Sequence, residues 1–281
     1  MAVNNKHNAG AGLGLLRALA IEGERIFTVA RAAELAPEAG ISRAYLNEAL
    51  HHLARAGWIV RLKKGLYAIS SLMPGVMPAH EFEIAMALVQ PAAISHWSAM
   101  SHHGLTDQVP GVVYVLTPAQ SVPVKRPGRS RGGAKVPSDG TFPVTDFRYR
   151  FVRVKPDRFF GVEEVWIRES RVTITDPERT LLDGLMAPHH CGDIGEVLHA
   201  FELHGEALDV ERIVSYALQL DTATARRLGW VLERNGVTDE RIAPLAGTKT
   251  TNYHRLDVGG PDDGPPNRRW MVRENLPGYR T

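Results

Sequence analysis

Residues 26–70 read IFTVARAAELAPEAGISRAYLNEALHHLARAGWIVRLKKGLYAIS and decide the fold of the amino-terminal part of the chain. Thr28 can cap a short helix that ends or kinks at Pro37, because proline lacks the backbone N–H that a helix interior needs. Gly40 then allows a tight turn, and Ser42 can cap the next helix. That helix has one apolar face, formed by Leu46, Ala49, Leu50 and Leu53. The pattern predicts two helices joined by a tight turn.

A basic hairpin is expected to follow this second helix. Gly57 ends the helix, and two apolar segments, 58–62 and 66–70, flank the short loop Lys63-Lys64-Gly65. A further helix is expected to begin at Gly12, after about ten polar residues that we expect to fray. Its apolar residues at helical spacing are Leu13, Leu16, Leu19 and Ala20. Three helices followed by a basic hairpin predict a winged helix-turn-helix DNA-binding domain over residues 1–75.

The composition is that of a folded two-domain protein. The chain has 281 residues, of which 44% are hydrophobic and 23% charged, values typical of globular proteins. Collagen, coiled coil and intrinsic disorder are therefore excluded as descriptions of the whole chain. Cys191 is the single cysteine, so an internal disulfide and a thiolate zinc cluster are excluded too. We find neither an apolar segment of the ~20 residues that a bilayer requires nor a signal peptide, and expect a cytoplasmic protein, nucleoid-associated when bound to DNA.

The net charge of +2 is distributed unevenly along the chain. Residues 1–75 contain nine Lys or Arg against five Glu and no Asp. Residues 120–155 contain nine Lys or Arg against two Asp. Two basic stretches in a nearly neutral chain indicate a localised surface for a polyanion.

The second helix of a helix-turn-helix enters the major groove of DNA and reads base edges with its outward side chains. Asn47 can pair with adenine through two hydrogen bonds, and Arg43 can bind guanine or a phosphate. Lysines at the hairpin tip would meet the DNA backbone. A solvated helix that contacts protein instead is the alternative, and Glu48 favours it because phosphates repel a carboxylate. The predicted DNA-binding residues are Thr28, Arg31, Ser42, Arg43, Tyr45, Asn47, His51, Arg61, Lys63 and Lys64.

The stretch 124–135 is the second basic feature, and its glycines indicate a flexible loop. Such a loop can settle onto nucleic acid or onto an acidic partner, although a solvated loop carries the same charges. The candidate contact residues are Lys125, Arg126, Arg129 and Arg131.

Residues 76–281 are expected to form a larger mixed α/β domain, which makes the fold class α+β. Strands are predicted at 112–116 and 148–155, with a hairpin over 162–175. Helices are predicted at 177–187, 192–203, 209–219 and 223–234, and a last strand near 268–275.

The sequence offers two weak signals for a catalytic or metal site. One signal is a group of three carboxylates that could hold Mg²⁺ in a nuclease site, Asp176, Glu178 and Asp183. This makes a nucleic-acid-processing enzyme the alternative function. The same residues fit a helix start better, because Asp176 is a good cap and Pro177 suits the first helical position. Histidines 96, 102, 103, 189 and 190 lack the spacing of known metal motifs, and hydrolase, P-loop and dinucleotide motifs are missing from the sequence. We therefore expect a non-enzymatic protein with no required cofactor or metal.

Several long segments resemble AbiEi-type antitoxins, in the same order as in that family. They are residues 25–69, PAAISHWSAMSHHGLTDQVPGVVYVLTP, FRYRFVRVKPDRFFGVEEVWI, VTITDPERTLLDGL and the ending NRRWMVRENL. The resemblance implies an antitoxin whose amino-terminal domain binds inverted repeats in its own promoter and represses transcription. It places Arg43, Tyr45 and Asn47 on the recognition helix and Lys63 and Lys64 on the wing.

The resemblance also implies a partner, a nucleotidyltransferase-like toxin that the carboxy-terminal domain neutralises while helping to place the protein on DNA. Whether antitoxin and toxin touch directly differs within the family. A scaffold that binds toxin but no longer reads DNA is a third alternative.

Overall fold

The computed structural model describes residues 3–70, 79–123, 140–238 and 240–276, with side chains from Gly10 onward. The chain divides into two compact units, Met1–Leu88 and Val89–Thr281. The boundary expected from the sequence, between residues 75 and 76, falls outside the described residues.

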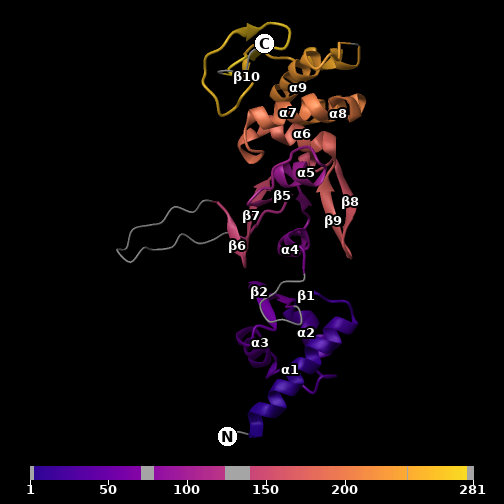
Figure 1. Ribbon diagram of the computed structural model, residues 1–281, viewed down its shortest axis with the longest axis vertical. Helices are drawn as coiled ribbons and strands as arrows, with labels where there is room; N and C mark the ends of the chain where they lie inside the picture. Colours follow the sequence, from indigo (N-terminus) through magenta and orange to yellow (C-terminus); the bar gives the residue numbers. More distant parts are fainter. Residues whose placement is uncertain (1–2, 71–78, 124–139, 239, 277–281) are drawn as a thin grey trace, which may run out of the picture. The chain divides into compact units, whose positions relative to one another are not determined.

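The first unit is a winged helix-turn-helix. Its elements are α1 (Val3–Ile21), β1 (Ile26–Thr28), α2 (Val29–Leu35), α3 (Leu46–Arg55), β2 (Ile59–Lys63), β3 (Leu66–Ile69) and α4 (Glu81–Leu88). The strands form one antiparallel sheet in the order β1-β3-β2 (Figure 1). β2 and β3 are the predicted hairpin, and β1, which the sequence analysis missed, adds the third strand.

Helix α1 differs from its prediction in two ways. It begins at Val3, within the stretch that we expected to fray. Leu13 and Ala20 are exposed, because the face that packs against the core is instead formed by Gly12, Leu15, Leu16 and Leu19. These four positions have the i, i+3, i+4, i+7 spacing of one helix face.

The second unit contains a six-stranded mixed sheet in the order β6-β7-β5-β4-β9-β8. Its strands are β4 (Ala93–Ile94), β5 (Val113–Thr117), β6 (Phe142–Val144), β7 (Phe147–Arg153), β8 (Val162–Ile167) and β9 (Ser170–Thr175). β8 and β9 form the predicted hairpin, and β5 runs parallel to β7. The α+β fold class is confirmed.

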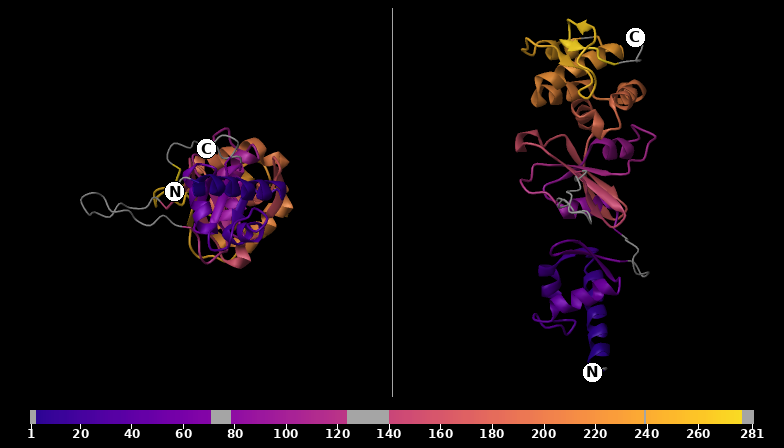
Figure 2. Two further views of the ribbon diagram at one scale, coloured as in Figure 1. Left: turned by 90° about the horizontal axis from the view of Figure 1, so that it is seen from below. Right: turned by 90° about the vertical axis from the view of Figure 1, so that its left-hand side faces the viewer.

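Helices cover one end of this sheet (Figures 1 and 2). They are α5 (His96–His102), α6 (Pro177–Met186), α7 (Ile194–His204), α8 (Val210–Leu220), α9 (Thr222–Arg234) and α10 (Ala243–Ala246). α6 to α9 enclose the main hydrophobic core, in which Cys191 is fully buried. A small sheet of β10 (His254–Arg255), β12 (Val272–Arg273) and β11 (Pro266–Asn267) follows.

Candidate nucleic-acid interface

Helix α3 has the two faces that a recognition helix requires. Leu46, Ala49, Leu50 and Leu53 are buried, as predicted. The polar side chains on the opposite face are all exposed: Asn47, Glu48, His51, His52 and Arg55. His52 was missed by the sequence analysis, although helical spacing from Glu48 places it on this face. Nε2 of His52 lies 3.6 Å from the Glu48 carboxylate.

The entry to α3 differs from the prediction. The helix begins at Leu46, and Ser42 is not its side-chain cap. The Ser42 carbonyl instead accepts hydrogen bonds from the backbone N–H groups of Tyr45 and Leu46, at 3.0 and 3.1 Å, which makes a helical turn ahead of α3. Ser42 and Arg43 are exposed on this turn. The hydroxyl of Tyr45 is buried and has no hydrogen-bond partner among the described residues, so this side chain packs inward.

The wing carries its basic residues in three different environments. Gly65 turns the hairpin with φ 77°, a left-handed conformation that glycine adopts without strain. Lys64 is exposed beside it, and Arg61 is exposed on β2 with Nε directed at the Lys63 carbonyl, 3.4 Å away. Lys63 is half-buried, and its Nζ donates a hydrogen bond to the Leu88 carbonyl at 2.7 Å. Lys64 is therefore the more available of the two wing lysines.

Two of the predicted DNA-binding residues have local structural roles. The Thr28 hydroxyl accepts a hydrogen bond from the Arg31 N–H at 3.1 Å and caps α2, as its position predicted. The Arg31 guanidinium lies within 3.3 Å of the carboxylates of Glu22, Glu24 and Glu34. Hydrogen bonds to Glu34 and Glu24 raise the pKa of Arg31, and the three carboxylates together leave little of its charge for a phosphate. The contacts with Glu22 and Glu24 could not be predicted from local pattern, because these residues precede the helix that carries Arg31.

The basic loop lies outside the described residues. Lys125, Arg126, Arg129 and Arg131 therefore remain predictions.

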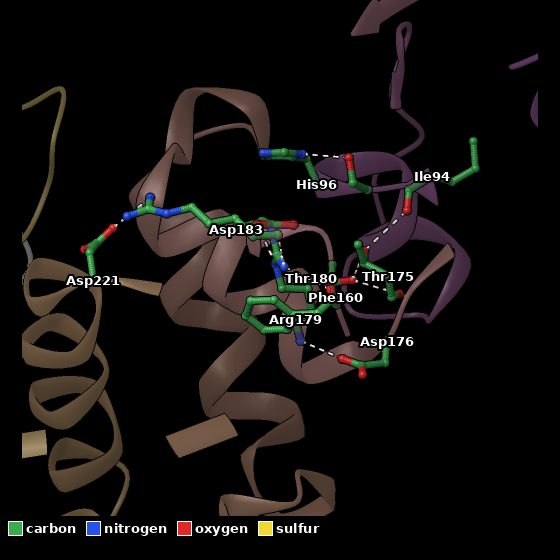
Figure 3. A network of polar contacts seen from close by, with 11 residues as sticks. Ile94, His96, Phe160, Thr175, Asp176, Arg179, Thr180, Asp183 and Asp221 are labelled. Atoms are coloured by element: carbon green, nitrogen blue, oxygen red, sulfur yellow. Dashed lines mark hydrogen bonds and ion pairs between the residues drawn. The ribbon is translucent and has the colours of Figure 1, made fainter. Parts of the chain in front are cut away.

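The second unit contains a buried polar network around Arg179 (Figure 3). The Arg179 Nε donates to Asp183 Oδ1 at 2.9 Å, and its Nη1 donates to the carbonyls of Arg158 and Phe160 at 2.8 and 2.9 Å. Its guanidinium also lies over the Phe160 ring, 4.8 Å from the centroid. Arg179 thereby ties α6 to the chain between β7 and β8.

The three carboxylates of the alternative Mg²⁺ site have separate partners. Asp176 caps α6 by accepting from the Arg179 N–H at 2.7 Å, and it accepts from the Tyr216 hydroxyl at 3.0 Å. Glu178 accepts from the Asp209 N–H at 2.9 Å. Asp183 forms the buried ion pair with Arg179. Within the described residues, His, Cys, Asp and Glu side chains form no group of three or more that suits a metal ion.

Two histidines lie near this network, His96 fully buried and His190 half-buried. His96 and His190 have ring centroids 5.3 Å apart, and Nδ1 of His96 lies 2.8 Å from the Ser95 hydroxyl. Burial, reinforced by neighbouring positive charge, lowers the pKa of each histidine to about 3. Both are therefore neutral at physiological pH, as ordinary core histidines are.

A helix-turn-helix with an exposed polar second helix and a basic hairpin defines a winged helix-turn-helix domain, a class typical of DNA-binding regulators. Residues 15–70 match the model of a family described as transcriptional regulator, AbiEi antitoxin. This match confirms the resemblance to AbiEi-type antitoxins over that segment. None of the described helices has the length and hydropathy to cross a membrane.

The fold of nearly the whole chain has a counterpart among solved structures. The crystal structure of the RV2827C protein from Mycobacterium tuberculosis is similar with a TM-score of 0.63 and 17% sequence identity. The likeness covers 93% of this chain and 90% of that one. At this identity it shows a shared fold. No curated protein matches the sequence.

Proposed function

We propose that the chain is an antitoxin that binds the promoter of its own operon, represses transcription and counteracts a nucleotidyltransferase-like toxin. One observation carries the proposal: the segment that matches the antitoxin-regulator family is also the segment that exposes the polar face of α3 beside a basic wing. The protein would act in the cytoplasm, at the nucleoid when bound to DNA.

Base recognition is assigned to α3 and the turn before it. Asn47 and Arg43 are exposed and have the amide and guanidinium groups that pair with adenine and guanine in the major groove. Glu48 has a place in this scheme, because a carboxylate can accept from the amino group of cytosine. His51 and Ser42 complete the exposed surface and supply further hydrogen-bonding groups.

Backbone anchoring is assigned to the wing. Lys64 and Arg61 would neutralise phosphates, with Lys64 contributing more than Lys63 because the Lys63 ammonium already donates to the Leu88 carbonyl. An operator built of inverted repeats would bind two copies of the chain, one on each half-site. The residues of the basic loop are proposed to add a secondary contact with nucleic acid or with the partner.

Toxin neutralisation is assigned to the second unit, Val89–Thr281. Its support is the family resemblance of its segments together with a fold that is compact without the winged helix. The carboxylates of the alternative enzymatic site are bonded to their own neighbours, so we make no catalytic assignment.

A reporter fused to the chain's own upstream region tests both parts of the proposal in cells. Expression of the full chain should lower reporter output, and Asn47→Ala should restore it. Cells that produce the toxin encoded beside this chain should grow again when the chain is co-expressed. The Asn47→Ala variant should rescue growth equally well. Unchanged reporter output with the wild-type chain would refute repression, and failed rescue would refute neutralisation.

A further inference from the structure

Helix α1 has an outward face that nothing in the described part of the first unit covers. Leu13, Arg17 and Ile21 follow one another every four residues, on the side of α1 opposite its buried leucines. Leu13 is 44% exposed and Ile21 is 74% exposed. Two large aliphatic side chains on one exposed helix face are a feature of interaction surfaces.

A groove runs beside this face, between α1 and the connection from α2 to α3. Its floor is formed by small residues, Gly14, Ala18 and Ala39. Arg17 stands on the α1 side of the groove, together with Glu22 directly after α1, and Glu38 stands on the other side. Small residues on the floor let a side chain of a partner approach the backbone closely.

Two charged residues of this groove, Arg17 and Glu38, are of opposite sign and have no ion-pair partner among the described residues, whereas the Glu22 carboxylate pairs with Arg31. Arg17 and Glu38 are both exposed, and neither forms an ion pair with another described residue. A two-fold interface places the same patch on both partners, so every charge must meet its complement in the same patch. One arginine and one glutamate on opposite sides of a groove meet that condition.

We propose that the α1 face, defined as Leu13, Gly14, Arg17, Ala18, Ile21 and Glu38, binds the α1 face of a second copy of this chain. Arg17 of each copy pairs with Glu38 of the other, and the aliphatic side chains of one copy cover the small-residue floor of the other. The contact does not depend on DNA binding. The patch is small, so the association is weak in free solution, with a dissociation constant between about 1 µM and 1 mM.

Two copies on adjacent half-sites would strengthen the same contact, because DNA holds them at a high effective concentration. This consequence rests on the proposed operator binding. Self-association is therefore measured without DNA, which separates a failure of the α1 contact from a failure of operator binding.

Sedimentation velocity of the full chain over that concentration range tests the proposal. The wild-type chain should show a reversible monomer–dimer equilibrium, and Ile21→Glu should abolish it. Arg17→Glu and Glu38→Arg should each raise the dissociation constant by about tenfold, since two symmetry-related pairs are lost in each. The double variant R17E/E38R should restore dimerisation, because it reverses both ends of each pair.

Lys64→Glu serves as a matched control, since it reverses an exposed charge in the same unit away from the α1 face. It should leave the dissociation constant unchanged. A wild-type chain that stays monomeric at every concentration would overturn the proposal. So would a dimer that survives Ile21→Glu, or a double variant no better than the single ones.

Discussion

Arg179 is almost fully buried, and its guanidinium donates hydrogen bonds to the buried Asp183 and to backbone carbonyls. Removing one member of a buried ion pair leaves the other charge unpaired, which typically costs about 3–5 kcal/mol. We therefore expect Arg179→Ala to lower the free energy of unfolding of the second unit by that amount in urea denaturation.

Arg171 provides the matched control for this prediction. It pairs with Glu164 on the exposed hairpin β8–β9, so Arg171→Ala should cost at most about 1 kcal/mol. Equal losses for the two variants would contradict the role assigned to Arg179.

His96 is expected to make the stability of the folded chain depend on pH. Its pKa is about 3 in the folded chain and near its ordinary value of 6.5 in the unfolded chain. Between pH 6.5 and pH 3, His96 is therefore protonated in the unfolded chain but neutral in the folded chain. The free energy of unfolding falls as the pH falls through this window. From pH 7 to pH 5 the loss attributable to His96 is about 2 kcal/mol.

The variant His96→Asn should remove this part of the pH dependence. Asparagine tolerates the left-handed backbone of this position, where φ is 49°. Denaturation curves at pH 7 and pH 5 measure the difference. An equally steep pH dependence in the variant would show that the proton is taken up elsewhere.

Some residue roles were readable from the sequence and others were not. The caps Thr28 and Asp176 were predicted correctly from the residues that follow them, whereas Ser42, predicted as a cap in the same way, is not one. Arg31 and Tyr45 were assigned to DNA, yet the first is held by three glutamates and the second directs its hydroxyl inward. The surroundings of these two side chains depend on how distant segments pack against one another, which local sequence pattern does not encode.

At the scale of elements, helix α9 contains a glycine in its interior for a reason of packing. Gly229 faces the fully buried Trp270, and a Cβ at this position would overlap the indole ring. In an open site, alanine would stabilise the helix by about 1 kcal/mol relative to glycine. Here we expect Gly229→Ala to destabilise the second unit by about 2 kcal/mol, because the core would be overpacked.

Gly205→Ala is the control, since a Cβ there meets no atom within 4 Å and the backbone is right-handed helical. It should change the melting temperature little. A Gly229→Ala variant as stable as this control would mean that Trp270 moves without cost.

Helix α3 and the wing are expected to differ in what they contribute to DNA binding. Asn47→Ala should reduce the preference for operator over random DNA by about 1–3 kcal/mol, the usual loss for a base contact. Lys64→Ala should weaken binding to both DNAs equally and make it less dependent on salt. Titrations at several salt concentrations measure both effects. If Lys64→Ala altered only sequence preference, the division of roles would be reversed.

Most of the long elements, although not α1, were predicted well, and the shortest ones were not. α6 to α9 and the β8–β9 hairpin carry a full amphipathic or alternating pattern, and their bounds were close to those expected. β1 and β4 are three and two residues long. So short a segment has no periodicity of its own, and only its neighbours in the sheet make it a strand.

At the scale of the whole molecule, sequence pattern predicted a winged helix followed by a larger α+β part. The strand order of the six-stranded sheet could not be predicted from sequence pattern, because strands distant in sequence, such as β4 and β9, are neighbours. The candidate interface was predictable in outline, since a helix face and a hairpin loop are local features. The sequence pattern did not predict which charged side chains of the interface are free to bind DNA, because this depends on contacts with α4 and with the residues before α2.

We expect the exposed face of α3 and the wing to bind the promoter. This is measured by fluorescence anisotropy of the full chain on DNA from upstream of its own gene, compared with random DNA of equal length. We predict tighter binding to the promoter by at least about a thousandfold, with affinity that falls steeply as salt rises. Equal and weak affinity for both DNAs at low salt would contradict the account.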